Sequence, residues 1–511
     1  MKRVVLFLMI CSLVLISTTM LAAPAQPPRK VMIALHVEPP SLDLSSTQNY
    51  PLTDLVSENM TEFLVGITPA GKLIPGLATS WKISPDGKRI EFALRKGVKF
   101  HSGDELTGKD VEFSYKRVTQ KVRLAGTALR LVEKCEVNDD YRVTFHFKSP
   151  DATFLPQRTC VPIVSKSYYD RVGEDKFVTN PAGTGPYKFV AFKLGEYIDL
   201  EANKDYWGDA PMVKEARFVI AKEGTTRVAM LKTGEADFIL DVPFPQVKEL
   251  ESAGFKTVKL PAHPNISLQF QNSNPNVPWY NRKVRLAMAH AIDTGSIVNR
   301  LLFGIPDHYA RLAPWELGHD PDLKPYPYDP KRAKQLLAEA GYPNGFELPL
   351  YYMVGRQAGL KEVVEAVVLY LGAISVRCKV EGLDPTKFME RVRDTWHGNP
   401  QAVFVGVSGP PITQYPDPTI ALEAGFWSKT AISLYSNPEF DKLLDEMKGT
   451  LDDAKRAEVI KKAVRLIHDD VATVLIAASK MVFATKPKIN YTATLKTNYA
   501  LMLLKEIRMV D

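Results

Sequence analysis

The sequence predicts an α/β fold made of more than one unit. Stretches with strand-like and helix-like patterns alternate along the 511 residues instead of gathering in separate halves, as in layered α/β proteins. Hydrophobic residues make up 45% of the chain and charged residues 24%, which is the composition of a globular protein. At about 150 residues per domain, the length corresponds to roughly three structural units.

The chain begins with a segment that predicts export. Lys2 and Arg3 precede an apolar run over residues 4–16, and small residues follow as far as Ala25. A positive start, a short apolar core and an A-x-A site form a secretory signal, so we predict a signal peptide over residues 1–25. The apolar run is shorter than the roughly 20 residues that a membrane-spanning helix needs. A retained membrane anchor is the alternative interpretation.

The four cysteines are compatible with an exported protein. Cys11 would leave with the signal peptide, and its bulky neighbours argue against lipid attachment. An oxidising compartment permits one disulfide, for which Cys135 and Cys160 are the nearer pair. Three free thiols, including Cys378, are the simpler alternative. No Cys/His spacing resembles a zinc site, so we predict no metal ligands.

The first third of the chain contains clear strand signals. Residues 84–87 read Ser-Pro-Asp-Gly, which predicts a tight turn. Residues 90–94 and 143–147 then alternate apolar and polar side chains, as expected of strands with one buried face.

Several helices are predicted from capping residues and from apolar side chains spaced i, i+3, i+4. Thr107 and Asp110 resemble a capping box at the start of one helix, and Asn281 is expected to cap a second. In a third helix, Asp329 is the cap, Pro330 the first residue and Gly341 the end. A fourth is marked by the apolar stripe Ala457, Ile460, Val464 and Ile467.

Motifs of known catalytic chemistry are missing from the sequence. It contains no Gly-x-Ser-x-Gly elbow, phosphate-binding loop or His-Glu-x-x-His helix. Gly183-Thr184-Gly185 lacks the third glycine of a dinucleotide fingerprint. Paired aspartates, such as Asp139-Asp140 and Asp452-Asp453, are interpreted as solvated turns and caps. We therefore predict no catalytic residue and no cofactor, and favour a binding protein over an enzyme.

The net charge argues against a nucleic-acid partner. The chain carries 65 Lys and Arg against 58 Asp and Glu, a formal charge of +7. Loss of Lys2 and Arg3 with the signal peptide would leave +5, a small surplus for a chain of this length. No low-complexity basic tract or internal repeat accompanies it.

One long stretch and several shorter blocks together resemble a known family. Residues 71–118 contain Gly-Lys-Leu-Ile-Pro-Gly-Leu-Ala-Thr-Ser-Trp and, further on, Lys-Gly-Val-Lys-Phe-His-Ser-Gly. Further blocks follow in order at 183–187, 203–208, 234–237, 284–293, 328–343 and 435–439. These blocks occur in the same order over the whole mature chain. Together they resemble the family 5 extracellular solute-binding proteins, the dipeptide- and oligopeptide-binding group that serves ABC importers.

The resemblance implies a two-lobe periplasmic binding protein fold of type II. Lobe I would take residues 26–262 with an extra subdomain at 56–179, lobe II would take 263–481, and residues 482–511 would return to lobe I. Because the chain would cross between lobes at least twice, a hinge rotation could close them over a ligand. Trp81 and Trp207 in the motif blocks are interpreted as core and turn aromatics, and Gly185 as a backbone requirement.

The resemblance also implies candidate ligand-binding residues. The loop after the first strand contains Pro40, Ser41 and Leu42, where related proteins use backbone groups against the ligand. Arg356 stands where dipeptide-binding relatives hold the peptide carboxylate, which a guanidinium can bind bidentately. An exposed loop arginine is the alternative for this position.

A third segment departs from the family pattern. Peptide-binding members have an aspartate three positions before the aspartate of an Asp-Pro pair, where it binds the α-amino group of the peptide. Here the pair is Asp417-Pro418, so Gln414 occupies that position and Tyr415 follows it. A neutral amide does not compensate a buried ammonium as a carboxylate does. Asp417 is a possible substitute, although a cap of the next turn is the simpler role.

These observations predict a periplasmic receptor for an ABC importer that transports peptides or peptide-sized organic solutes. The partners would be the solute and the permease subunits at the inner membrane, and we expect a monomer. A non-peptide or amine-blocked anionic solute, held by Arg356, competes with a normal peptide because of Gln414. A secreted hydrolase is the remote alternative, and metal or haem capture ranks below organic solutes.

Overall fold

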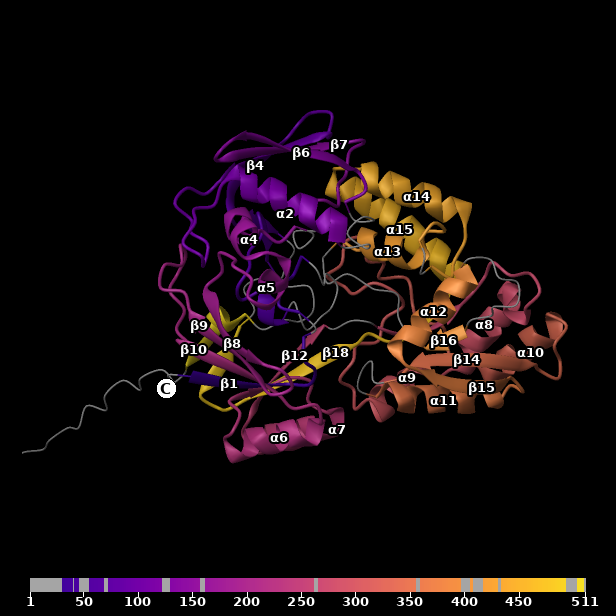
Figure 1. The fold of residues 1–511 in the computed structure, drawn as a ribbon. Helices are drawn as coiled ribbons and strands as arrows, with labels where there is room; N and C mark the ends of the chain where they lie inside the picture. Colours follow the sequence, from indigo (N-terminus) through magenta and orange to yellow (C-terminus); the bar gives the residue numbers. More distant parts are fainter. Residues whose placement is uncertain are drawn as a thin grey trace, which may run out of the picture.

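The structure is a computed structural model with a mixed α/β fold arranged around three larger sheets (Figure 1). It describes residues 30–39, 41–45, 55–68, 72–121, 129–156, 161–261, 265–354, 359–396, 405–407, 417–430, 433–492 and 503–509. The predicted signal peptide lies outside these ranges. We name the main parts of the molecule by their sheets: the seven-stranded, four-stranded and five-stranded parts.

The seven-stranded part is built on strands from both ends of the chain. Its order is β12-β18-β11-β1-β10-β9-β8, and β1 runs parallel to β10 and β11. Helices α6 (Gly224–Thr233) and α7 (Phe244–Ser252) lie below the sheet in Figure 1. The strands are β1 Lys30–Leu35, β8 Tyr187–Lys193, β9 Tyr197–Ala202, β10 Glu215–Ile220, β11 Phe238–Ile239, β12 Lys256–Pro261 and β18 Lys480–Thr485. A small pair, β19 (Ile489–Tyr491) and β20 (Ile507–Met509), follows β18.

The four-stranded part is an antiparallel sheet with the order β4-β5-β7-β6. The strands are β4 Ala78–Ile83, β5 Arg89–Leu94, β6 Val132–Asp139 and β7 Arg142–Phe147. Helix α2 (Gly108–Lys121) packs against β6 and β7, and the hairpin of β2 (Val65–Ile67) and β3 (Leu73–Pro75) precedes the sheet. Helices α4 (Lys166–Val172) and α5 (Glu174–Thr179) lead the chain back to the seven-stranded sheet.

The five-stranded part has the order β15-β14-β16-β13-β17, with β14 parallel to β15 and β16. The strands are β13 Ile266–Phe270, β14 Glu347–Met353, β15 Arg377–Leu383, β16 Val405–Val407 and β17 Thr473–Ala477. Around them lie α8 (Arg282–Ala291), α9 (Thr294–Ser296), α10 (Pro330–Glu339), α11 (Leu360–Gly372) and α12 (Pro385–Trp396). A helical bundle of α13 (Thr419–Phe426), α14 (Pro438–Gly449) and α15 (Asp453–Asp469) stands beside the four-stranded part in Figure 1.

The chain crosses between the two larger sheets twice, through one antiparallel ribbon. β12 leads into β13 on the way out, and β17 leads into β18 on the way back. Pro261 pairs with Lys480 on one side of the crossing, and Ile266 pairs with Ala477 on the other. At the crossing itself, the Ser479 backbone N–H donates to Asn265 Oδ1 at 3.0 Å. Pairs of adjacent strands therefore flank the connection on both sides.

The hydrophobic core is continuous at this crossing and divided elsewhere. One cluster joins Ala34 and Ile239 of the seven-stranded sheet to Leu268 and Val474 of the five-stranded sheet. The four-stranded sheet and the helical bundle each have a separate cluster. Among the described residues, the four-stranded sheet and the helical bundle therefore share no hydrophobic cluster.

The boundaries of helices and strands agree with the structure where they were predicted from capping residues or from alternating apolar and polar side chains. Asn281 and Asp329 cap α8 and α10 with their side chains, and Gly341 follows α10 with a φ of 90°. The Thr107–Asp110 box is half formed. Asp110 Oδ2 accepts from the Thr107 backbone N–H at 2.9 Å, whereas the threonine hydroxyl donates to the same carboxylate.

The described cysteines are free thiols. Cys135 is buried and Cys378 half-buried, and burial raises the pKa of the Cys135 thiol to about 12 and that of the Cys378 thiol to about 11. Cys160 lies outside the described residues. Both described thiols are therefore neutral and unreactive at neutral pH. Over the described ranges, no helix combines the length and the apolar character needed to cross a membrane.

Candidate functional site

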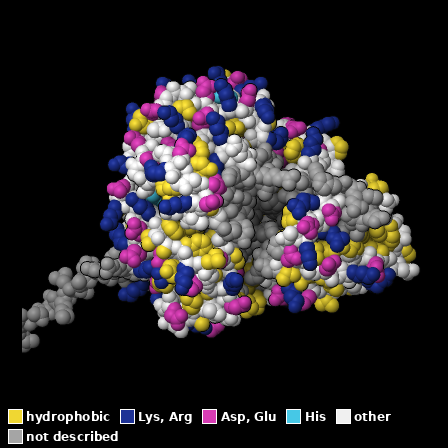
Figure 2. Space-filling model, in the orientation of Figure 1, with side chains coloured by type: hydrophobic (Ala, Val, Ile, Leu, Met, Phe, Trp, Pro, Cys, Tyr) yellow, Lys and Arg dark blue, Asp and Glu magenta, His cyan; other side chains and the backbone are white. Residues whose placement is uncertain are grey.

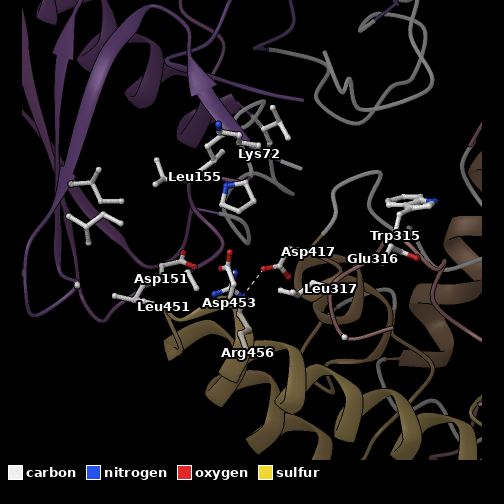
Figure 3. Close-up of a pocket in the computed structure, with 18 of the residues that line it drawn as sticks. Lys72, Asp151, Leu155, Trp315, Glu316, Leu317, Asp417, Leu451, Asp453 and Arg456 are labelled. Carbon is white, nitrogen blue, oxygen red and sulfur yellow. Dashed lines mark hydrogen bonds and ion pairs between the residues drawn. The ribbon is translucent and has the colours of Figure 1, made fainter. Parts of the chain in front are cut away.

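A cavity of about 830 Å³ lies between the four-stranded part and the helical bundle (Figure 3). Its walls come from segments far apart in the sequence: residues 67–90 and 151–156 on one side, and residues 314–319, 417 and 451–456 on the other. A volume of this size is within the range of pockets that hold drug-sized ligands. The cavity is therefore a candidate site formed by described residues.

The wall from the four-stranded part is largely apolar. Ile67 and Leu73 of the β2–β3 hairpin line it together with Trp81 of β4 and Leu155. Two charged side chains stand in this wall, Lys72 and Asp151, and Figure 3 shows Asp151 across from Asp417 and Arg456. The Asp151 side chain is held by a turn, because its Oδ1 accepts from the Thr153 backbone N–H at 3.0 Å.

The opposite wall is organised by one buried arginine. Arg456, in the first turn of α15, donates from Nε to Asp417 Oδ2 at 2.8 Å and from Nη1 to the Thr450 carbonyl at 2.7 Å. Its Nη2 donates to Asp453 Oδ1 at 2.5 Å. Because the arginine and Asp417 are both almost fully buried, their pairing fixes the start of α13 against the start of α15. Asp417 stands two residues before α13, and its Oδ1 accepts from the N–H of Thr419, the first residue of that helix, at 2.9 Å.

The loop from residue 314 to 319 completes this wall with aromatic and acidic groups. Trp315 is 42% exposed and reaches the cavity beside Glu316. Glu316 is buried, and its Oε2 accepts from the Ala313 backbone N–H at 2.6 Å. The preceding Arg311 is buried and lies 4.4 Å from the centre of the Phe426 ring. Burial lowers the pKa of Arg311 to about 10, so it is still charged at neutral pH.

Next to the cavity, the two walls are joined by an ion network. Arg130 of the four-stranded part donates to Glu423 Oε1 of α13 at 3.0 Å, and Lys448 of α14 donates to Glu423 Oε2 at 2.7 Å. The Arg130 guanidinium also stacks 4.6 Å from the centre of the Trp427 ring. The Ala152 backbone N–H donates to the Lys448 carbonyl at 2.9 Å. These contacts hold the four-stranded part against the helical bundle.

Of the predicted ligand residues, Asp417 lines the cavity and two others do not. Leu42 is buried in the core of the seven-stranded part, and the Ser41 hydroxyl donates to the Val178 carbonyl at 3.3 Å. Pro40, Arg356, Gln414 and Tyr415 lie outside the described residues.

The loop that follows β1 is fixed by charges within its own half of the molecule. Asp43 forms a buried ion pair with Arg117 of α2, and the same arginine donates to Glu174 Oε2 at 2.7 Å. At the start of the loop, burial lowers the pKa of His36, whereas nearby Asp241 raises it. The ring is therefore mostly neutral at neutral pH, and the described part of this loop is anchored by its own side chains.

Most of the cavity lining was not predicted from the sequence, including its polar and aromatic residues Asp151, Trp315 and Arg456. Arg456 had a recognisable signal, because it shares the buried stripe of α15 with Val459, Ile460 and Ala463, and an arginine at such a position needs a buried partner. Asp151 looked like any Asp-x-Thr turn, and Trp315 like a loop aromatic. Trp81 was interpreted as a core residue, yet it also lines the cavity.

The surface around the site carries mixed charges. Figure 2 shows Lys and Arg side chains interspersed with Asp and Glu over the visible face. Within the part of the chain that the structure describes, no group of three or more His, Cys, Asp or Glu side chains could hold a metal ion. The site geometry thus offers hydrogen bonds, ion pairs and aromatic faces to an organic molecule.

Comparison with known protein families shows to which family this chain belongs. Residues 72–425 match the sequence profile of the bacterial extracellular solute-binding proteins, family 5. The chain belongs to this family. The resemblance predicted from the sequence is confirmed, as is the two-lobe α/β fold of its members.

Relatives of this solute-binding protein match it over nearly its whole length. Heme-binding protein A of Haemophilus influenzae is 30% identical over 93% of this chain and 89% of its own. The glutathione-binding protein GsiB of Pectobacterium atrosepticum is 28% identical over 93% of both chains. Among solved structures, the periplasmic binding protein DppA of Helicobacter pylori in complex with the peptide STSA superposes with a TM-score of 0.80, at 25% identity over 94% of this chain and 98% of its own.

Proposed function

We propose that this solute-binding protein is exported, encloses a peptide-sized organic solute between its two lobes, and delivers it to the permease of an ABC importer. The observation that carries the proposal is the cavity between the four-stranded part and the helical bundle, two units that lie on opposite sides of the crossing between the seven-stranded and five-stranded sheets. We call the arrangement in which the four-stranded part and the helical bundle are in contact the joined state. A solute that touches both walls of the cavity binds this state more tightly than the separated state, and it therefore shifts the equilibrium between the two toward the joined state. Residues 1–25 would direct export and be removed in the course of it, and the permease would meet the mature protein in the periplasm.

The proposed lobes follow the boundaries predicted from the sequence. Lobe I would comprise residues 26–262 and 482–511, including the subdomain at 56–179, and lobe II residues 263–481. The cavity would then lie between that subdomain and lobe II. Delivery without chemical change fits the absence of catalytic motifs in the sequence, and we propose a receptor and not an enzyme.

The ligand class can be tested directly on purified protein. Native mass spectrometry of material prepared without denaturation is expected to show a retained organic molecule. Thermal-shift screening would then compare di- to pentapeptides, their N-acetylated forms, glutathione and haem, because the relatives named above bind ligands of these classes. Stabilisation by none of these, and no retained molecule, would contradict the proposal.

A second candidate ligand is an amine-blocked or non-peptide anionic solute. Gln414, in place of the family aspartate, favours it, as does Arg356 if this arginine binds a carboxylate. Arg356→Ala is expected to weaken such a solute by more than about 1.5 kcal/mol, the scale of a charge-assisted hydrogen bond. Isothermal titration calorimetry measures this loss, and unchanged affinity would remove Arg356 from the site. Strong binding of free-amine peptides that is abolished by N-acetylation would contradict the inference from Gln414.

A secreted hydrolase is distinguished by turnover. Incubation of a bound peptide for hours, followed by chromatography, is expected to return the peptide unchanged in a one-to-one complex. Appearance of cleavage products in step with enzyme concentration would favour the hydrolase.

A further inference from the structure

Asp151 presents an unused acceptor to the cavity. The side chain lines the cavity wall and the residue is only 5% exposed. Oδ1 accepts from the Thr153 backbone N–H at 3.0 Å and from the Thr153 hydroxyl at 2.6 Å. Oδ2 is buried and has no hydrogen-bond partner among the residues that the structure describes. A buried carboxylate oxygen left in this state costs free energy, so a donor from a ligand would be favourable at this point.

The charges that line the cavity indicate which kind of ligand group would donate a hydrogen bond to Asp151. Four carboxylates line it, those of Asp151, Glu316, Asp417 and Asp453, against the two cations Lys72 and Arg456. Arg456 is committed to Asp417 and Asp453 by ion pairs. Arg311 adds a third cation close to Glu316, so four carboxylates face three cations, and the remaining negative charge favours a cationic group over an anionic one.

Two indole rings add to the same preference. Trp81 lines the cavity from the four-stranded part and Trp315 from the loop opposite. The face of an indole attracts an organic cation through its ring quadrupole. An alkylammonium group combines what the wall offers, since it donates hydrogen bonds to a carboxylate and brings apolar carbons to the aromatic and aliphatic side chains.

We propose that the cavity between the four-stranded part and the helical bundle binds an ammonium group of the captured solute, with Asp151 Oδ2 as its acceptor. This inference rests on the proposed function, and it names the chemistry of one end of the solute. The same contact favours the joined state of the molecule, because an ammonium held by Asp151 on one wall also meets the negative field of Asp417 and Glu316 on the other.

Asp151→Asn is the matched variant for a test. Asparagine keeps the Oδ1 acceptor for Thr153, so the turn is retained, but it replaces the free oxygen by an N–H₂ group and removes the charge. Asp139→Asn is the control: Asp139 ends strand β6 of the four-stranded part, its side chain is 43% exposed, and it pairs with Arg142 at the surface. It makes the same chemical change without lining the cavity.

The first probe is n-butylammonium chloride, compared with sodium chloride at the same ionic strength. The wild-type protein and Asp139→Asn are expected to gain about 2 °C in Tm from the organic cation beyond the effect of sodium. Asp151→Asn is expected to lose this difference. Equal responses of wild type and Asp151→Asn, or no response of the wild type, would overturn the inference.

The second measurement uses the compound that native mass spectrometry identifies in the wild-type protein. If that compound carries an amine, its Kd is expected to rise at least tenfold in Asp151→Asn, whereas its N-acetylated form should bind both proteins equally. A retained compound without a basic group, or equal affinity in both proteins, would refute the ammonium site and leave the receptor function intact. Failure of the wild type to bind any solute would instead refute the proposed function.

Discussion

At the scale of single residues, His101 shows how burial sets the charge of a side chain. Nε2 lies 2.9 Å from the Gly185 carbonyl oxygen, which can only accept, so this nitrogen carries the proton. Nδ1 is buried without a partner among the described residues. Burial is the main cause that lowers the pKa of the ring to about 4, and nearby Lys188 contributes in the same direction. The ring is therefore neutral in the folded protein at every pH above this value.

This neutral ring makes the protein sensitive to acid. In the unfolded chain His101 regains its usual pKa of 6.5, so between about 6.5 and 4 the unfolded state binds a proton that the folded state does not. The free energy of unfolding is expected to fall by up to about 3 kcal/mol as the pH drops through this window. Urea titrations at several pH values would measure it.

His101→Gln is expected to flatten that part of the pH profile, because glutamine can still donate to Gly185 and has no charge to gain. His290→Gln serves as the control, since this partly exposed ring lies in the five-stranded part next to the Pro327 carbonyl. An unchanged profile in His101→Gln would show that other groups cause the acid sensitivity.

At the scale of elements, the loop over residues 183–185 shows why a motif can be architectural. The Gly185 N–H donates to the Met60 carbonyl at 2.9 Å. A Cβ at Gly185 would lie 2.6 Å from the Met60 carbonyl carbon and 2.7 Å from the Asn59 oxygen. Both obstacles are backbone atoms, so the neighbour has no side chain to move away. The glycine is needed for close approach of two backbones, as the sequence interpretation proposed.

Gly185→Ala is expected to destabilise the protein by about 2 kcal/mol, because two backbone segments must separate to admit the methyl group. Chemical denaturation would report this loss as a lower midpoint. Gly372→Ala is a suitable control, since Gly372 ends helix α11 and a Cβ there meets nothing within 4 Å. It should be neutral or stabilising by about 0.5 kcal/mol. Equal stability of the two variants would contradict this account of Gly185.

Helices and strands could be predicted from the sequence where local patterns, such as alternation of apolar residues and capping side chains, define them. Residues 90–94 alternate as strand β5 does in burial, and Asn281 and Asp329 cap the helices they were expected to cap. The cavity was not predictable in this way, because its walls meet only through tertiary packing. Asp151 and Asp417 are 266 positions apart in the sequence, and no periodicity relates them. Family resemblance located Asp417, and nothing local indicated that Asp151 faces it.

At the scale of the whole molecule, contacts between the four-stranded part and the helical bundle would stabilise the closed state of the proposed receptor. Glu423 and Lys448 are each only 3% exposed in their side chains and form a pair within the bundle. Arg130 reaches this pair from the other part. A charge-assisted hydrogen bond that excludes water is worth about 1.5–3 kcal/mol, which is enough to shift a two-state equilibrium by an order of magnitude.

Arg130→Ala is expected to weaken solute binding about tenfold, mainly through faster dissociation, because the separated state becomes more populated and the apparent affinity falls with the competent fraction. The Glu423–Lys448 pair remains, so the bundle keeps its buried charges neutralised. Stopped-flow kinetics and small-angle X-ray scattering of the solute-free protein would measure the two effects.

Lys232→Ala is the control for this experiment, since Lys232 pairs with Glu249 on the surface of the seven-stranded part. It should change neither the dissociation rate nor the radius of gyration. If Arg130→Ala behaves in the same way, the contact with Glu423 has no role in holding the two parts together.

The position of β18 has a consequence for the order in which the molecule can be completed. This strand comes from residues 480–485, yet it lies between β12 and β11 in the sheet that contains the first strand of the chain. A nascent polypeptide still attached to the ribosome, or threading a translocation channel, lacks the piece that fills this gap. The seven-stranded sheet therefore cannot be completed until synthesis is nearly finished, and strand pairings between residues so far apart in the sequence form slowly. If the chain is exported as proposed, this delay favours a precursor that is still unfolded when it is secreted.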